Sequence, residues 1–89
     1  FDAVELRYPL LVRNRLAGDT MRPYGLNGTK KVQDMFVDAK VPRSRRDKLP
    51  LLADGDGRIL WIPGLRRSGH ALVREHTRTT LRATYEAEN

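Results

Sequence analysis

The stretch LPLLADGDGRILWI, residues 49–62, decides the fold that this sequence predicts. Two apolar runs, residues 49–53 and 58–62, flank the tetrapeptide DGDG at 54–57, and aspartate and glycine favour the tight turns that join paired strands. Both runs are apolar at successive positions, so both faces of each strand need cover. We therefore predict a β-hairpin at the centre of a sheet, covered by a helix.

The covering helix is predicted because the apolar residues after residue 28 recur at helical spacing. Val32, Met35, Phe36 and Ala39 fall at helical spacing and form one apolar stripe. A second, short and basic helix is predicted over residues 42–48, with a proline in its first turn.

The start of the main helix raises an electrostatic question. Thr29 is its predicted N-cap, which puts Lys30 and Lys31 in the first helical turn. The helix dipole disfavours cations at this end, so we predict that an anion such as a phosphate binds there.

Alternating residues predict strands at both ends of the chain. Residues 4–8 and 10–16 alternate with a period of two, so Arg13 and Arg15 should project from the same face. Residues 79–85 alternate in the same way and predict a final strand.

The predicted fold class is α+β: a small mixed or antiparallel sheet of four to six strands packed on one main helix and one short basic helix. Residues 18–28 predict a long irregular loop, and residues 65–77 give no clear pattern. With 89 residues, one domain spanning residues 1–89 is expected. The sequence opens at Phe1, so we expect a fragment of a larger protein.

The composition restricts the class of protein. Hydrophobic residues make up 39% and charged residues 31%, which favours a folded module over a disordered chain. No apolar run approaches the roughly 18 residues that span a bilayer, and the N-terminus lacks a signal-peptide pattern. We expect a cytoplasmic protein with no membrane partner. Cysteine is absent, which excludes disulfides and thiolate metal sites.

Candidate catalytic and metal-binding residues have plainer interpretations. Asp54 and Asp56 lack the further oxygen ligands of a calcium loop, so we interpret them as turn residues. His70 and His76 have no carboxylate at metal-ligand spacing, and zinc is not expected. Trp61 lies in an apolar run and is predicted to be a core residue. Without an activated nucleophile or paired carboxylates, we expect no catalytic residue, metal site or cofactor in this chain.

Positive charge is concentrated in one part of the chain. Residues 7–48 carry 11 Lys and Arg residues against four Asp, within a net charge of +6. These cations fall in separate elements around one helix, which favours a phosphate-binding surface over scattered solvated charges. Tyr24, in the loop, is the candidate for stacking on an RNA base. The predicted nucleic-acid-binding residues are Arg13, Arg15, Arg22, Tyr24, Lys30, Lys31, Lys40, Arg43, Arg45, Arg46 and Lys48.

A family resemblance covers about residues 10–66. It is carried by the segments VRNRLAGD (12–19), RPYG (22–25), GTKKV (28–32), KVPR (40–43), RDKLPL (46–51) and LWIPG (60–64). In this order and spacing they resemble the C-terminal domain of bacterial tRNA(Ile)-lysidine synthetases. Thr20 departs from the pattern, which has a larger and often basic residue there.

The resemblance implies a parent enzyme that uses ATP, with Mg²⁺, to attach lysine to the wobble cytidine of an isoleucine tRNA. That chemistry lies in an N-terminal PP-loop domain whose phosphate loop is absent here, so no catalytic residue is carried over. The C-terminal domain is implied to hold the acceptor-stem region of the tRNA. Its expected partners are the isoleucine tRNA and the rest of the parent enzyme, and a homodimer is left open.

Two alternatives from other classes remain at this point. The chain could be an interdomain structural module whose basic face docks on an acidic surface of its parent without contacting RNA. It could also be a small enzyme or nucleotide binder, which would require a well-formed pocket holding an acid or a histidine of altered pKa.

Overall fold

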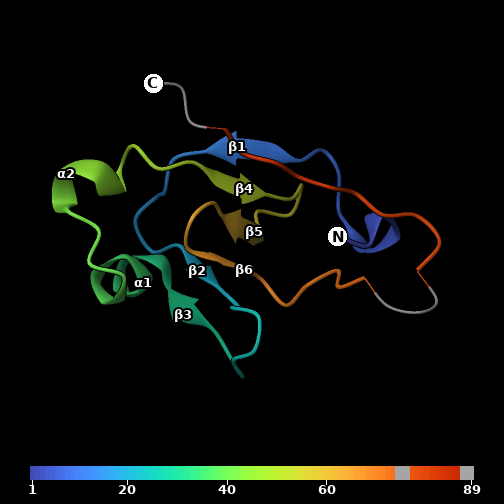
Figure 1. Cartoon of the computed structure of the whole chain (residues 1–89), viewed down its shortest axis with the longest axis horizontal. Helices are drawn as coiled ribbons and strands as arrows, with labels where there is room; N and C mark the ends of the chain where they lie inside the picture. Colours follow the sequence, from blue (N-terminus) through green and yellow to red (C-terminus); the bar gives the residue numbers. More distant parts are fainter. Residues whose placement is uncertain (74–76, 87–89) are drawn as a thin grey trace.

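A four-stranded antiparallel sheet forms the centre of the computed structural model, which describes residues 1–73 and 77–86 (Figure 1). Its strands are β1 (Leu11–Arg13), β4 (Leu51–Ala53), β5 (Ile59–Ile62) and β6 (Arg66–Arg67), in that spatial order. A separate antiparallel ribbon pairs β2 (Thr20–Met21) with β3 (Lys30–Lys31). The helices α1 (Val32–Asp38) and α2 (Arg43–Arg46) lie together at one end of the molecule. The predicted α+β class is confirmed.

The β4–β5 hairpin occupies the two central positions of the sheet, as its apolar runs predicted. Its turn is closed by Asp54, whose Oδ1 accepts hydrogen bonds from the backbone N–H groups of Asp56 (3.0 Å) and Arg58 (2.8 Å). Gly55 packs against the N-terminal segment so closely that a Cβ there would lie 2.6 Å from the carbonyl oxygen of Tyr8. A glycine is therefore required at this position by contact with backbone atoms.

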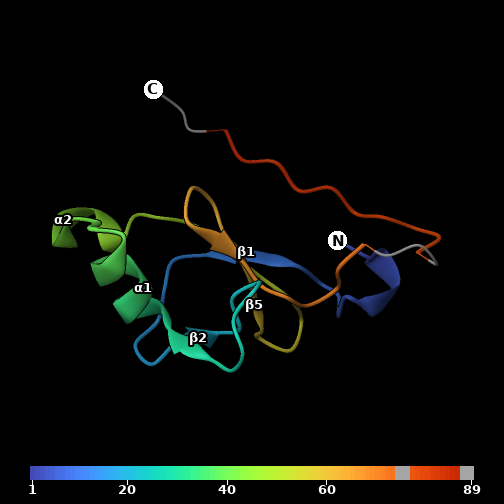
Figure 2. The same cartoon turned by 60° about the horizontal axis from the view of Figure 1, so that its bottom comes forward.

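Two hydrophobic clusters cover opposite faces of the hairpin. The first joins Phe36 and its neighbours on α1 to Leu51, Ile59 and Ile62, which confirms the predicted cover by the main helix. The second surrounds Leu60 and includes Leu81 from the C-terminal segment. Figure 2 shows the β2–β3 ribbon on one side of the main sheet and residues 77–86 on the other.

The strand predicted over residues 4–8 is wrong. Ala3–Glu5 form a 3-10 helix, η1, because the side chain of its N-cap residue, Asp2, accepts a hydrogen bond from the Val4 N–H at 3.1 Å. The strand predicted over residues 10–16 is shorter, since β1 ends at Arg13. Residues 79–85 contain no strand, and only an isolated bridge joins Thr80 to Asp2.

The predicted start of the main helix is also wrong. Lys30 and Lys31 form β3 instead of the first helical turn, because both pair with β2. The helix begins at Val32, whose N–H donates to the carbonyl oxygen of Asp19 at 3.0 Å, and its N-cap is Lys31 rather than Thr29. The short basic helix is confirmed as α2, with Pro42 at its N-cap rather than in its first turn. Strand β6, which pairs with β5, lies in the segment for which the sequence predicted no element.

Candidate nucleic-acid interface

Arg13, one of the predicted contacts, is held by an intramolecular partner. Its two terminal nitrogens donate to the two carboxylate oxygens of Asp19 at 2.9 and 3.1 Å, and the backbone N–H of Leu16 donates to the same carboxylate at 2.7 Å. The hydrogen bond from Arg13 holds the pKa of Asp19 below its usual value, and the same bond raises the pKa of Arg13. The pair therefore fixes the turn after β1.

Replacing Asp19 with Asn is expected to make the free energy of unfolding depend less on pH in the acid range. Because the folded pKa of Asp19 lies below the unfolded value of 3.8, the pair stabilises the fold above that pH. This contribution is lost as the pH falls through the lowered folded pKa. Urea denaturation from neutral to strongly acid pH should give a variant that is less stable at neutral pH and loses less stability with acid. If both proteins lost the same amount of stability in acid, the proposed contribution of Asp19 to the pH dependence of stability would be contradicted.

Three other predicted contacts have intramolecular partners. Arg15 lies beyond the end of β1, and its Nε is 3.1 Å from Asp47. Lys30 pairs with Asp38 at the end of α1, which gives this cation a partner without an anion at the helix start. Arg46 donates from Nε to the carbonyl oxygen of Val41 at 2.9 Å, and so joins α2 to the segment that precedes it.

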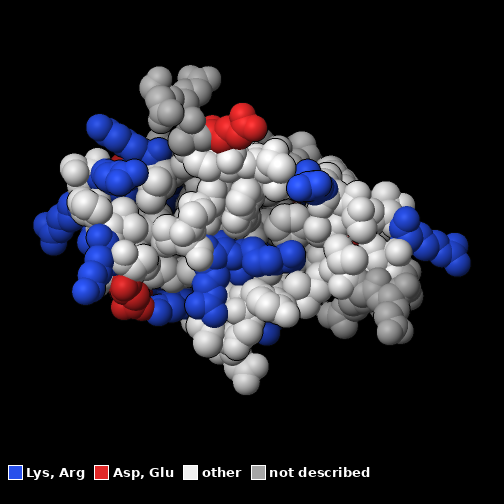
Figure 3. Space-filling model, viewed as in Figure 1, with Lys and Arg blue, Asp and Glu red and all other residues white. Residues whose placement is uncertain are grey.

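The largest group of unpaired cations surrounds α2. Within residues 1–73 and 77–86, the structure records no hydrogen bond or ion pair for the side chains of Lys40, Arg43, Arg45 and Lys48, which we call the α2 basic cluster. All four are exposed. Figure 3 shows Lys and Arg side chains over the end of the molecule formed by α1 and α2, with another group over the middle of this face. The cluster offers four solvated charges, two on α2 itself and one on the segment to either side of it.

Two further predicted contacts face outward from the β2–β3 ribbon. Met21 pairs with Lys30 and is buried, so the neighbouring pair of Thr20 with Lys31 faces away from the core. Lys31 and Arg22 are both exposed, and no side-chain partner is recorded for either among the described residues. These two cations add to the charges available to an external anion.

The sequence interpretation missed the two arginines of β6. Arg66 donates from Nη2 to the carbonyl oxygen of Tyr24 at 2.9 Å, while Arg67 donates to the carbonyl oxygens of Ser68 and His70. Together they fasten the loop of residues 22–29 and the segment after β6 to the sheet edge. The turn at 63–64, directly after an apolar strand, was the signal that could have predicted them.

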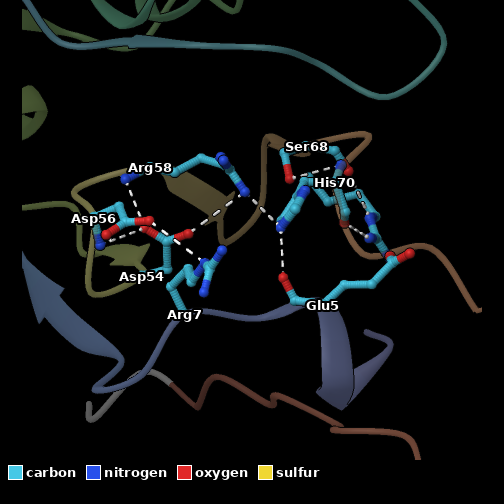
Figure 4. A network of polar contacts seen from close by, with 8 residues as sticks. Glu5, Arg7, Asp54, Asp56, Arg58, Ser68 and His70 are labelled. Carbon is cyan, nitrogen blue, oxygen red and sulfur yellow. Dashed lines mark hydrogen bonds and ion pairs between the residues drawn. The ribbon is translucent and has the colours of Figure 1, made fainter.

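A polar network joins the N-terminal segment, the hairpin turn and the segment after β6 (Figure 4). Arg58 Nη1 lies 2.5 Å from His70 Nε2, and the same nitrogen of His70 lies 2.9 Å from the carbonyl oxygen of Glu5. Arg7 and Asp56 form a looser ion pair at 3.7 Å. The histidine therefore links two chain segments, and Asp54 has the turn role that the sequence predicted.

The described residues also limit other kinds of site. Across residues 1–73 and 77–86, no three His, Cys, Asp or Glu side chains come together as metal ligands. No helix in the same part of the chain has the length and apolar character to cross a membrane. Trp61, predicted to lie in the core, is only partly buried, beside Phe1 and Arg67. His76 lies outside the described residues.

Comparison with known proteins identifies relatives of this chain. The model of a family described as the TilS substrate C-terminal domain matches residues 10–82. The tRNA(Ile)-lysidine synthase of Bacillus subtilis (strain 168) is 48% identical over 64 residues, which cover 72% of this chain and 14% of that protein. The tRNA(Ile)-lysidine synthase of Geobacillus kaustophilus is 41% identical over 88 residues, 99% of this chain and 19% of that protein.

A fused relative and two solved structures are also similar. The bifunctional protein TilS/HprT of Listeria monocytogenes serotype 4b is 52% identical over 69 residues, 78% of this chain and 11% of that protein. A crystal structure of a TilS C-terminal domain has a TM-score of 0.76 and 45% identity, covering 84% of this chain and 58% of that one. An N-terminal fragment of the phenylalanyl-tRNA synthetase β-subunit from Pyrococcus horikoshii shares the fold alone, with a TM-score of 0.72 at 18% identity over 86% of this chain and 24% of that one. The chain spans between 11% and 19% of the length of these curated relatives.

Proposed function

This chain belongs to the family described as the TilS substrate C-terminal domain, and we propose that it binds the tRNA substrate of a larger enzyme through its unpaired basic side chains. The observation that carries the proposal is the α2 basic cluster, whose four exposed cations have no recorded partner among the described residues. Cations of this kind neutralise phosphates and release the counterions condensed on RNA, which favours binding. Phosphate contacts would orient the tRNA without reading its sequence.

The proposed interface has a centre and an extension. Its centre is the α2 basic cluster, and Lys31 and Arg22 extend it along the β2–β3 ribbon. The intramolecular partners of Arg13, Arg15, Lys30 and Arg46 give these four residues a supporting role: they hold the turn, the ribbon and α2 in place. The domain thus contributes positioning rather than chemistry, and we assign it no catalytic residue.

The activity of the parent enzyme is part of the same proposal. Curated relatives are named tRNA(Ile)-lysidine synthases, and by analogy the parent would ligate lysine to an isoleucine tRNA in the cytoplasm. ATP and Mg²⁺ would be used in the portion that precedes this domain. The domain would hold the acceptor-stem region, away from the wobble position where lysine is attached.

A salt titration tests the proposed function. The affinity of the full chain for an isoleucine tRNA transcript, measured by fluorescence anisotropy, should fall linearly on a log–log plot against salt concentration. If four to six cations contact phosphates, the expected slope is roughly −4 to −5. The affinity for a second tRNA serves as the control, because attraction by charge alone would bind both tRNAs equally. The ratio of protein to tRNA in the complex would show whether the chain binds as a dimer. Absence of binding at low salt would overturn the proposal and favour the interdomain structural module.

A further inference from the structure

A hollow of about 850 Å³ lies between three segments that are distant in the sequence. One wall is the loop of residues 22–29, the second is the hairpin turn at 56–58, and the third is the segment 68–72. Its volume falls within the roughly 300–1,000 Å³ of small-molecule pockets. We call it the loop hollow.

The loop hollow is held open by backbone contacts. The N–H of Tyr24 donates to the carbonyl oxygen of Arg67 at 2.9 Å, and the N–H of Gly69 donates to the carbonyl oxygen of Arg22 at 3.0 Å. Arg66 adds the bond from its guanidinium to the carbonyl oxygen of Tyr24. The first and third walls are therefore fixed to each other before any ligand arrives, which lowers the entropic cost of binding.

The side chains of the loop hollow combine an aromatic ring with cations. Tyr24 is 53% exposed, although tyrosine has a large apolar ring. Arg22 has no recorded side-chain partner among the described residues, and Arg58 and His70 lie on the walls opposite the loop. Asp56 also lines the hollow and forms an exposed ion pair with Arg7 at 3.7 Å, so the lining carries two arginines and one carboxylate and is net positive.

The geometry around His70 leaves Arg58 able to change partner. Nε2 of a neutral histidine can accept from Arg58 or donate to the carbonyl oxygen of Glu5, but it cannot do both at once. Figure 4 shows the imidazole between these two groups. A phosphate that accepted a hydrogen bond from Arg58 would let His70 donate to Glu5. Nη1 of Arg58 also lies 3.7 Å from Oδ2 of the buried Asp54, and this ion pair keeps the guanidinium beside the hairpin turn.

We propose that the loop hollow takes one unpaired nucleotide of the bound RNA, with its base stacked on Tyr24 and its phosphate against Arg22 and Arg58. The inference rests on the proposed tRNA binding and deepens it. An unpaired base can offer its π-face to the tyrosine ring, whereas bases within a helix are already stacked on their neighbours. The α2 basic cluster would hold duplex phosphates, while the loop hollow would recognise single-stranded RNA.

Two RNA probes test this inference on the full chain. One is a blunt-ended hairpin, and the other is the same hairpin with a short single-stranded 3′ extension that carries a fluorescent adenine analogue. The extended probe should bind more tightly, and its fluorescence should be quenched on binding. Tyr24→Ala should weaken binding of the extended probe by roughly 5- to 150-fold, down to the affinity of the blunt probe. Tyr24→Phe should retain the tighter binding, because it keeps the ring.

The controls separate this inference from the proposed function. Tyr85 is also exposed, at 48%, and lies outside the loop hollow, so Tyr85→Ala should bind both probes like the unchanged protein. Amide NMR spectra would establish that each variant is folded. If the two probes bind equally and Tyr24→Ala weakens neither, or weakens both to the same extent, the loop hollow inference is overturned while RNA binding stands. If neither probe binds at low salt, the proposed function fails as well.

Discussion

Neutralising the α2 basic cluster should weaken tRNA binding by roughly 100-fold or more at low salt, since each contact of a charged donor with phosphate contributes on the order of 1 kcal/mol. The variant carries Gln at Lys40, Arg43, Arg45 and Lys48. All four side chains are exposed and lack recorded partners among the described residues, so their loss should leave the fold intact. The slope of affinity against salt should become shallower by about four, one for each lost phosphate contact.

A pair of matched double variants tests whether position matters more than total charge. Arg43→Gln with Arg45→Gln removes two charges from the cluster. Arg78→Gln with Arg82→Gln removes two charges from the C-terminal segment, where both arginines are also exposed. The first pair should weaken binding at least several-fold more than the second and reduce the salt slope by about two. Equal losses would mean that net charge alone attracts the tRNA and that α2 is not a specific interface.

The central parts of the fold were predictable because they depend on consecutive residues. The hairpin at residues 49–62 has apolar runs around a turn, and helical spacing located the body of α1, although the helix was predicted to begin two residues too early. The apolar runs of the hairpin and the helical spacing of α1 both arise because one element packs against the other along its whole length, so the buried positions recur regularly in the sequence. The predicted central position of the hairpin follows from the same cause, because runs that are apolar at successive positions are typical of strands buried on both faces.

The predicted ends of helices and strands were wrong where a single contact with a residue outside the element decides where it begins. Lys30 and Lys31 would suit a helix, but pairing with β2 across an intervening loop keeps them extended. At the N-terminus, one carboxylate at Asp2 accepts from the backbone and turns Ala3–Glu5 into η1. Such contacts leave no periodic trace, so periodicity could not have predicted them.

The sequence identified the basic residues of the candidate interface, but it could not divide them into paired and unpaired cations. Charge density located the basic region, but it did not distinguish a cation that is free from one that is paired. Arg15 and its partner Asp47 are 32 positions apart, and Lys30 and Asp38 are eight apart on different elements. The folded chain brings these groups together, and only then do Arg43 and its neighbours remain as available charges.

Replacing Phe36 with Ala should lower the free energy of unfolding by about 3–5 kcal/mol, the largest stability loss that we expect from a single substitution. Phe36 is fully buried in the cluster that joins α1 to β4 and β5. The guanidinium carbon of Arg15 also lies 5.9 Å from the centre of its ring, and Arg15 pairs with Asp47 directly after α2. Removing the ring would leave a cavity and loosen the support beneath the α2 basic cluster.

Val37 provides the matched control on the same helix. It is 51% exposed, so Val37→Ala should change the free energy of unfolding by less than about 0.5 kcal/mol in urea denaturation. A chain of this size has roughly 5–15 kcal/mol of stability in total, so Phe36→Ala should leave it partly unfolded at room temperature if its stability lies at the low end. RNA binding should then fall with the folded fraction, although Phe36 itself is buried and cannot contact RNA. A loss no larger than that of Val37→Ala would contradict the assigned core, and with it the argument that the core fixes the position of α2.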